Sequence, residues 1–170
     1  VIGQTAFVAS RLAGLQAIDW RDPLDPVLIG QHATLDLAQD VFVHGRYAYV
    51  ASWSAGLEIF DVLNPTNLVR VGQCDTPGRA HQVSLNGTRA YVADRAGGFS
   101  IIDISDPTRP ALIGTAATAD FAEGLATVNE HVFVAAAGSG LQVFNAANPL
   151  APTWLAQLDT PGHAESLTLV

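Results

Sequence analysis

The sequence contains no lysine, no methionine and only one cysteine, and none of its apolar runs is long. All eight basic residues are arginines, and the sixteen acidic residues leave a formal net charge of -8. Without lysine, Schiff-base chemistry and P-loop phosphate binding are excluded. The acidic balance argues against nucleic acid or an anionic membrane surface as a partner. No feature calls for a cofactor, and we expect none.

The lone Cys74 excludes an internal disulfide and a cysteine-ligated metal cluster. No stretch approaches the roughly 18 to 20 apolar residues that a membrane-spanning helix needs, so we expect no membrane insertion in this segment. Because methionine is absent, we expect the chain to be a processed or partial product of something longer.

The chain repeats one pattern four times at intervals of 42 residues. The same step relates four short motifs: a Gly-Leu or Gly-Phe pair, an aromatic-Val-Ala triplet, an Asp-Pro or Asn-Pro turn, and a threonine. Such regularity indicates a repeat architecture. We expect one domain over 1–170, with units at about 1–37, 38–79, 80–121 and 122–163 and a final inner strand at 164–170.

Each unit is expected to form four short strands. In the third unit these are HQVSL (81–85), RAYVAD (89–94), FSIIDIS (99–105) and ALIGT (111–115). Asn86-Gly87 predicts a hairpin turn in which both residues have positive φ. No segment has a sustained 3.6-residue apolar period, so the chain is predicted to be all-β. Four-stranded units of about 40 to 45 residues are typical of β-propeller blades, with the first strand innermost and the fourth outermost.

The two ends of the chain occupy matching places in the repeat. Leu169-Val170 falls in the register of Val1-Ile2, at the end of the first strand of a unit. We therefore expect 164–170 to be an inner strand without its hairpin partner. Either this strand completes the first blade and closes a small ring, or the four repeats are part of a larger or two-chain propeller; we favour the second.

The third strands, LQAID, LEIFD, FSIID and LQVFN, resemble the LVIVD repeat, as does the pattern YVAD…GG-FSIIDISDPTRPALIG around them. The resemblance extends over essentially the whole chain. Asn145 in place of Asp, Trp20-Arg21 in the first turn and Ala156 in place of Gly are departures that affect local turns. The resemblance implies a β-propeller found largely in bacterial and archaeal surface or secreted proteins, with no well-defined common activity. It thus implies a secreted or cell-surface location.

One acidic position recurs at the end of the third strand of every unit, at Asp19, Asp61, Asp103 and Asn145. A catalytic carboxylate would be unique and differently tuned. An acceptor that Asn can replace points to hydrogen bonds with the backbone of the following turn. We therefore interpret these four residues as structural.

The loops vary more than the strands and are expected to carry the binding site, by analogy with other propellers. One loop position holds a different polar residue in each unit: Gln39, His81, Glu123 and Glu165. Its neighbours include Asp40, Arg79, Gln82 and His163, and the loops between the second and third strands add Arg11, Trp53, Asp94 and Arg95. The candidate ligand-binding rim comprises His81, Glu123, Glu165, Trp53, Arg79, Arg95, Asp40 and His163.

Two kinds of chemistry are open to this rim. His81 with Glu123 and Glu165 is a weak candidate for a hard cation such as Ca²⁺, and the alternative is a polar rim that lines a wet channel. Trp53 with Arg79 and Arg95 could receive a sugar or an anionic group. The alternative there is a tryptophan packed on the next blade.

No motif for nucleophilic, metalloprotease or nucleotide chemistry is present. We therefore expect a non-catalytic extracellular interaction or scaffold module that contacts a protein or carbohydrate through loops on one face. One alternative is a self-associating building block that forms rings or filaments through its unpaired end strands. Another is a hydrolase or lactonase with an axial site around His81, Glu123 and Glu165.

Overall fold

A computed structural model describes residues 3–169 and confirms the predicted all-β class. These residues form fifteen strands in four antiparallel sheets. No helix occurs among them, and none of them could therefore cross a membrane as a helix.

The strands follow one another in chain order within each sheet. The first sheet contains β1 (Thr5–Ser10), β2 (Gly14–Asp19) and β3 (Val27–His32). The second contains β4 (Asp40–His44), β5 (Tyr47–Ala51), β6 (Leu57–Asp61) and β7 (Val69–Cys74). The third contains β8 (Gln82–Asn86), β9 (Arg89–Ala93), β10 (Phe99–Asp103) and β11 (Ala111–Ala116). The fourth contains β12 (Gly124–Val128), β13 (His131–Ala135), β14 (Leu141–Asn145) and β15 (Thr153–Leu158).

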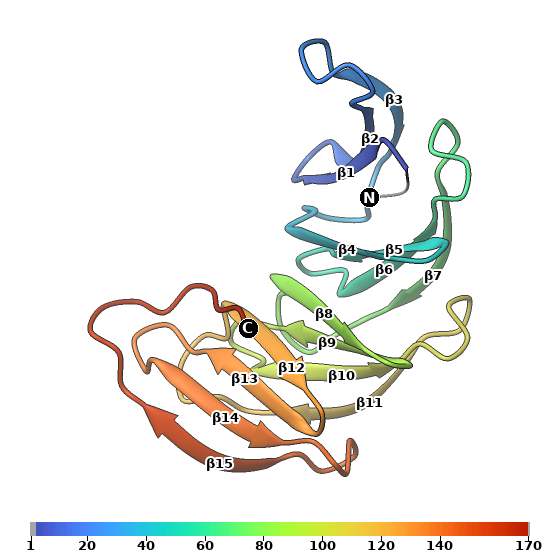
Figure 1. Cartoon of the computed structure of the whole chain (residues 1–170). Helices are drawn as coiled ribbons and strands as arrows, with labels where there is room; N and C mark the ends of the chain where they lie inside the picture. The colour runs from blue at the N-terminus through green and yellow to red at the C-terminus, as the bar shows by residue number, and fades with distance from the viewer. Residues whose placement is uncertain (1–2, 170) are drawn as a thin grey trace.

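The four sheets follow one another round an open arc rather than a closed ring (Figure 1). The strands β4, β8 and β12 lie on the inner side of the arc and contact one another in sequence, while β7, β11 and β15 lie at the outer side. This is the radial arrangement of propeller blades, with the first strand of each unit innermost.

The hairpin between β8 and β9 differs from the predicted turn. Asn86 pairs with Arg89, so Gly87 and Thr88 form the two-residue loop. Only Gly87 has positive φ, at 60°, as in a type II′ turn. Our prediction of positive φ at both Asn86 and Gly87 was wrong because the turn lies one residue further along the chain.

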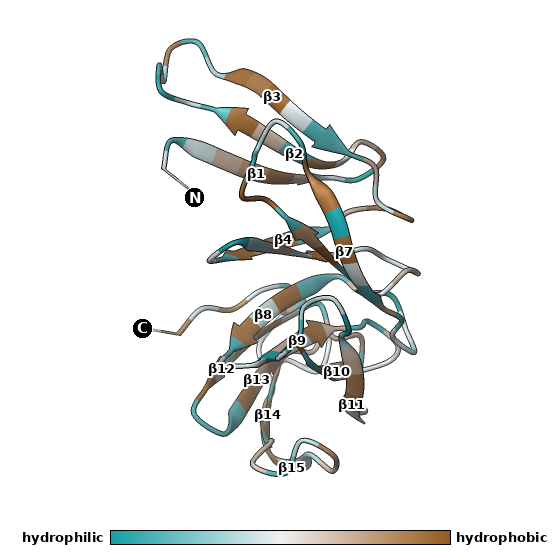
Figure 2. Ribbon diagram, turned by 90° about the vertical axis from the view of Figure 1, so that its right-hand side faces the viewer, coloured by the Kyte–Doolittle hydropathy of each residue, from teal (hydrophilic) through white to brown (hydrophobic). Residues whose placement is uncertain are grey.

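The hydrophobic core consists of three clusters, one between each pair of neighbouring sheets. Figure 2 shows the sheets stacked on one another, with apolar and polar residues alternating along β7. The outer strands approach the next sheet closely at Gly30, Gly72 and Gly114. A Cβ atom at Gly72 would overlap the carbonyl oxygen of Pro107 in the next sheet. Glycine is therefore required wherever another sheet packs in this way.

The predicted inner strand at 164–170 forms no ladder among the described residues. Ala164 makes one isolated bridge, to Ala137, and the residues that follow run beside the start of β12. Val170, like Val1-Ile2, lies outside the described residues. A β-strand needs a partner strand, and no described strand pairs with this segment, so the strand stays a prediction.

Candidate functional site

The loops at one end of the sheets form a continuous surface, here called the loop face. It combines the loops within sheets (10–14, 52–56, 94–98 and 136–140) with the connectors that follow each sheet (33–39, 75–81, 117–123 and 159–165). Each loop makes an isolated bridge to the following connector, as Trp53 does to Ala80 and Arg95 to Ala122. The second residue of each loop has positive φ, at 40° for Trp53 and 49° for Arg95. Since Arg11 and Ala137 share this conformation, the backbone of the repeat sets it, and the side chain is free to vary.

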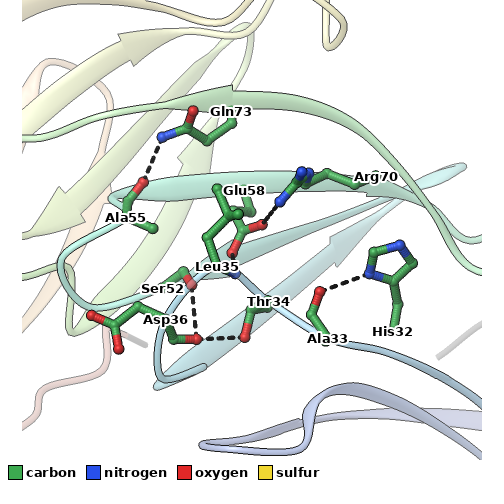
Figure 3. Close-up of polar contacts among 10 residues, drawn as sticks. All are labelled: His32, Ala33, Thr34, Leu35, Asp36, Ser52, Ala55, Glu58, Arg70 and Gln73. Atoms are coloured by element: carbon green, nitrogen blue, oxygen red, sulfur yellow. Dashed lines mark hydrogen bonds and ion pairs between the residues drawn. The ribbon is translucent and has the colours of Figure 1, made fainter.

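Each connector between two sheets contacts the loop of the next sheet, and we call this contact a junction. At two of the three junctions among residues 3–169, a carboxylate of the connector closes the contact. At the first junction, Asp36 accepts hydrogen bonds from the backbone N–H and the hydroxyl of Ser54 in the next loop. In return, Oε1 of the buried Glu58 accepts the N–H of Leu35 at 2.8 Å (Figure 3). The hydroxyl of Ser54, followed by the N–H of Leu37, holds the pKa of Asp36 below its ordinary value.

The third junction repeats this arrangement. Asp120 accepts the N–H of Gly138 at 3.1 Å, and Oε1 of Gln142 accepts the N–H of Ala119 at 3.1 Å. We call these two the closed junctions.

At the middle junction the connector donates the hydrogen bond and the loop accepts it, which is the reverse of the first and third junctions. Its connector carries Gly78 where the others have Asp36 and Asp120, and the carboxylate comes instead from Asp94 in the next loop. Asp94 accepts the hydroxyl of Thr76 and the N–H of Gly78, both at 2.7 Å, and the hydroxyl of Ser100 at 3.4 Å. Pro77 has no N–H to donate, which explains why Ser100 stands where Glu58 is found in the second sheet. We call this the open junction.

Asp94 is fully buried in the open junction. Burial raises the pKa of this carboxyl, and the hydrogen bonds from Thr76 and Gly78 offset part of that rise. The carboxylate thus points into the protein, away from the surface of the loop face, and ties the loop to the connector.

A pocket of about 680 Å³ opens over the open junction. Its lining residues are Trp53, Pro77, Gly78, Arg79, Arg95, Ala96 and Phe121. The guanidinium carbons of Arg79 and Arg95 lie 5.3 and 5.5 Å from the ring centroid of Trp53. Arg95 also lies 5.0 Å from the ring of Phe121. We call this the Trp53 pocket; two cations meet there on an aromatic surface.

A second pocket of about 270 Å³ shares Arg95 with the first. It is lined by His81, Arg95, Glu123, His163 and Glu165, and we call it the His81 pocket. Arg95 donates to Oε2 of Glu123 at 2.8 Å. The Nδ1 atom of His81 lies 2.7 Å from the carbonyl oxygen of Glu123, so Nδ1 carries the proton in this contact. The predicted hydrolase site therefore has its residues close together, while its activity stays a prediction.

The geometry of the described residues does not favour the cation alternative for His81, Glu123 and Glu165, which stays a prediction. No group of three metal-ligating side chains converges among residues 3–169. Oε2 of Glu123 faces the guanidinium of Arg95, whose positive charge opposes a bound cation, and Nδ1 of His81 is used by a backbone carbonyl.

Asp40, another rim candidate, lies apart from both pockets. Its Oδ2 atom accepts the N–H of Val83 at 3.0 Å, and Gln82 makes the equivalent bond to Leu125 at 2.5 Å. These side chains link consecutive inner strands. Asp40 therefore has a structural contact that sequence reasoning did not anticipate.

The repeated acids at the ends of the third strands make the same local contact in every sheet. Each accepts the backbone N–H two residues further on, at 2.8 to 3.0 Å. The four residues are Asp19, Asp61, Asp103 and Asn145. Such bonds lock the turn that ends the strand, and because only an acceptor oxygen is needed, Asn serves as well as Asp.

Sequence reasoning missed Phe121 as a wall of the Trp53 pocket. A signal was present: Leu37, Arg79, Phe121 and His163 occupy one register position, and the basic members follow Thr-Pro-Gly. The connector type thus decides whether this position of the loop face is apolar or basic.

Comparison with known proteins agrees with this repeat geometry. The family description "LVIVD repeat" matches residues 37–76 and 77–118. The chain contains LVIVD repeats, over residues 37–118. No curated protein matches it significantly.

Two computationally designed proteins share the fold of this LVIVD-repeat chain. Ika8 superimposes with a TM-score of 0.73 at 10% identity, over 100% of this chain and 51% of its own. The chain therefore spans about half the length of Ika8. Ika4 superimposes with a TM-score of 0.61 at 12% identity, over 82% of this chain and 83% of its own. At these identities the likeness concerns the fold alone.

Proposed function

We propose that this LVIVD-repeat chain is a non-catalytic interaction module that binds its ligand on the loop face. The observation that carries this proposal is the Trp53 pocket, about 680 Å³ in volume and walled by aromatic and arginine side chains. Pockets of a few hundred to about 1,000 Å³ with few, well-placed polar groups are typical of ligand sites.

The frame around the pocket favours binding by a preformed surface. Trp53, Arg79 and Arg95 lie on loops whose backbones are fixed by bridges and by hydrogen bonds to Asp94. A ligand would thus meet side chains that are already ordered, which lowers the entropic cost of binding. In our proposal the module acts outside the cell or at its surface, and the ligand is a protein or a carbohydrate.

The test is a binding screen against defined oligosaccharide and peptide arrays. We expect Trp53→Ala to abolish the binding that the wild-type chain shows. Trp154→Ala is the matched control, because Trp154 is 59% exposed on β15, outside the pocket. Binding that survives in the Trp53 variant, or that is lost equally in both variants, contradicts the proposal.

Self-association is a second candidate, favoured by the extended segment 165–169. These residues make no ladder among the described strands, whereas their equivalents in β4, β8 and β12 pair with a neighbouring strand. In this candidate the segment pairs with β1 of another copy. Deleting residues 165–170 would then lower the particle mass measured by light scattering at equal concentration, and an unchanged mass would refute it.

A further inference from the structure

We propose that the Trp53 pocket recognises an acidic sugar, with the anionic group held by Arg79 and Arg95 and the sugar ring placed against the aromatic walls. This inference rests on the proposed function, since it names the ligand class of the same site. It follows from the distribution of charge, from the hydrogen bonds that are already made, and from the shape of the pocket.

At the open junction the positive and negative side chains lie apart, because the arginines line the pocket while the carboxylate of Asp94 is buried. In the closed junctions, the connector places Asp36 or Asp120 on the loop face. In the open junction, Gly78 takes that position and the compensating carboxylate is Asp94, which is fully buried. The lining of the Trp53 pocket therefore contains two arginines and no acidic residue. Within a chain of net charge -8, this is a local positive site.

The two arginines retain donors for a ligand. Arg95 uses Nη1 to bind Glu123. Arg79 is exposed and forms no ion pair with any carboxylate among residues 3–169, although it contributes, after Ser54 and Leu37, to lowering the pKa of Asp36. Both guanidinium groups are oriented by contact with the ring of Trp53. Guanidinium groups held in this way bind carboxylate or sulfate oxygens through pairs of hydrogen bonds.

The backbone of the pocket offers little to a peptide. Among the lining residues, the N–H groups of Gly78, Arg79, Arg95 and Phe121 donate to acceptors within the chain, and Pro77 has no N–H. A peptide that adds to a sheet edge satisfies its main chain on such groups. Recognition here therefore relies mainly on side chains, which favours a sugar over a peptide.

The size and walls of the pocket favour more than a free anion. A volume of about 680 Å³ far exceeds that of a single carboxylate or sulfate group. Trp53, Phe121 and Pro77 supply flat or apolar surface beside the cations. The C–H face of a sugar ring packs on such surfaces, while its carboxylate reaches the arginines.

The experiment measures binding of three probes by isothermal titration calorimetry: digalacturonic acid, neutral digalactose and sodium sulfate. We expect digalacturonic acid to bind the wild-type chain, with an affinity that falls as salt is added. The affinities of digalactose and sulfate should be at least tenfold lower. Arg79→Leu installs the residue found at the same register position in the first connector, Leu37. This substitution should lower the affinity for digalacturonic acid by about 10- to 100-fold, which corresponds to the loss of a charge-assisted hydrogen bond.

Arg109→Leu is the matched control, because Arg109 lies in the turn between β10 and β11, outside both pockets. It should leave binding unchanged, and equal melting temperatures of the two variants would show that both fold. Equal binding of digalactose, or sulfate binding as tight as that of digalacturonic acid, would overturn the acidic-sugar assignment and leave the interaction module standing. Peptide binding through Trp53 would do the same. An absence of any Trp53-dependent ligand on the arrays would instead overturn the proposed function itself.

Discussion

The closed and open junctions both join a connector to the loop and the third strand of the next sheet. They differ in whether the connector or the loop provides the carboxylate that ties the two together. At the first junction the connector provides Asp36 and the next sheet provides backbone N–H groups. At the middle junction the next sheet provides Asp94 and the connector provides the N–H of Gly78. Both arrangements tie the loop to the connector, and both leave the strands in the same register.

The difference has a consequence at the surface. When the carboxylate moves from the connector to the buried loop position, the rim loses a negative charge and gains the cation Arg79 in place of Leu37. The repeat can therefore change the chemistry of its loop face without changing its frame. Binding properties should be separable from stability at the open junction.

The largest expected effect comes from replacing the glycine that allows each pair of neighbouring sheets to pack closely. Gly72→Ala places a Cβ against the backbone carbonyl of Pro107, in the turn between β10 and β11 of the next sheet, so the backbone must shift to accept it. We expect the free energy of unfolding, measured in urea, to fall by about 3 kcal/mol, the upper range for overpacking. Ala156→Gly is the reverse change at the equivalent position of the fourth sheet, and should cost about 0.5–1 kcal/mol through backbone entropy. Equal losses in the two variants would contradict the packing argument.

The next effect compares the two carboxylates directly. Asp94→Ala leaves the N–H of Gly78 and the buried hydroxyl groups of Thr76 and Ser100 without their acceptor, so we expect a loss of about 2–3 kcal/mol. Asp36→Ala removes a half-buried acceptor whose donors can turn to water, and should cost less than about 1 kcal/mol. Urea unfolding of both variants at pH 7 measures the difference. A larger loss for Asp36→Ala would reverse our ranking of the junctions.

How much of this structure can be predicted from the sequence depends on whether a contact joins residues of one repeat unit or of two. Strands and turns follow from residues close in the chain, so the 42-residue period and the Asp-Pro and Asn-Pro turns locate all four sheets. The orientation of Asp94 depends on Pro77 and Gly78, which belong to another unit, and repeat alignment alone does not show which way its carboxylate points. Likewise, Glu123 was a candidate cation ligand until the fold placed Arg95 beside it.

The pH dependence of stability should also separate the two carboxylates. Burial raises the pKa of Asp94 above its ordinary value of 3.8. The folded state therefore binds this proton more tightly than the unfolded state. The extra stability that the bound proton provides is present at acid pH and is lost as pH rises from about 4 through the raised pKa, while the hydrogen bonds to the carboxylate remain. Asp94→Asn removes this titration, while its amide can still accept from Gly78 and donate to Thr76.

Urea unfolding at a series of pH values from 4 to 7.5 tests this sign. We expect the wild-type chain to lose stability relative to Asp94→Asn as pH rises through that range. Parallel curves for the two proteins would show that Asp94 has the same pKa in the folded and unfolded states. Asp36→Asn serves as the opposite case, because the pKa of Asp36 is lowered and its contribution is lost at acid pH.

The smallest effect concerns Asp103, which lies outside both junction types. Its Oδ1 atom accepts the N–H of Ser105 at 2.9 Å, and this bond is the main reason why the pKa of Asp103 lies below its ordinary value. Asn145 makes the equivalent bond to Ala147 at 2.8 Å, so Asp103→Asn should leave the melting temperature at pH 7 almost unchanged. The wild-type contribution is present above about pH 4 and is lost as pH falls through the lowered pKa, so the variant should lose less stability on acidification. Asp103→Ala, which has no acceptor, should melt at a lower temperature than Asp103→Asn at every pH. If the two variants melt together, the turn does not depend on this acceptor, and the recurrence of Asp or Asn at the position needs another explanation.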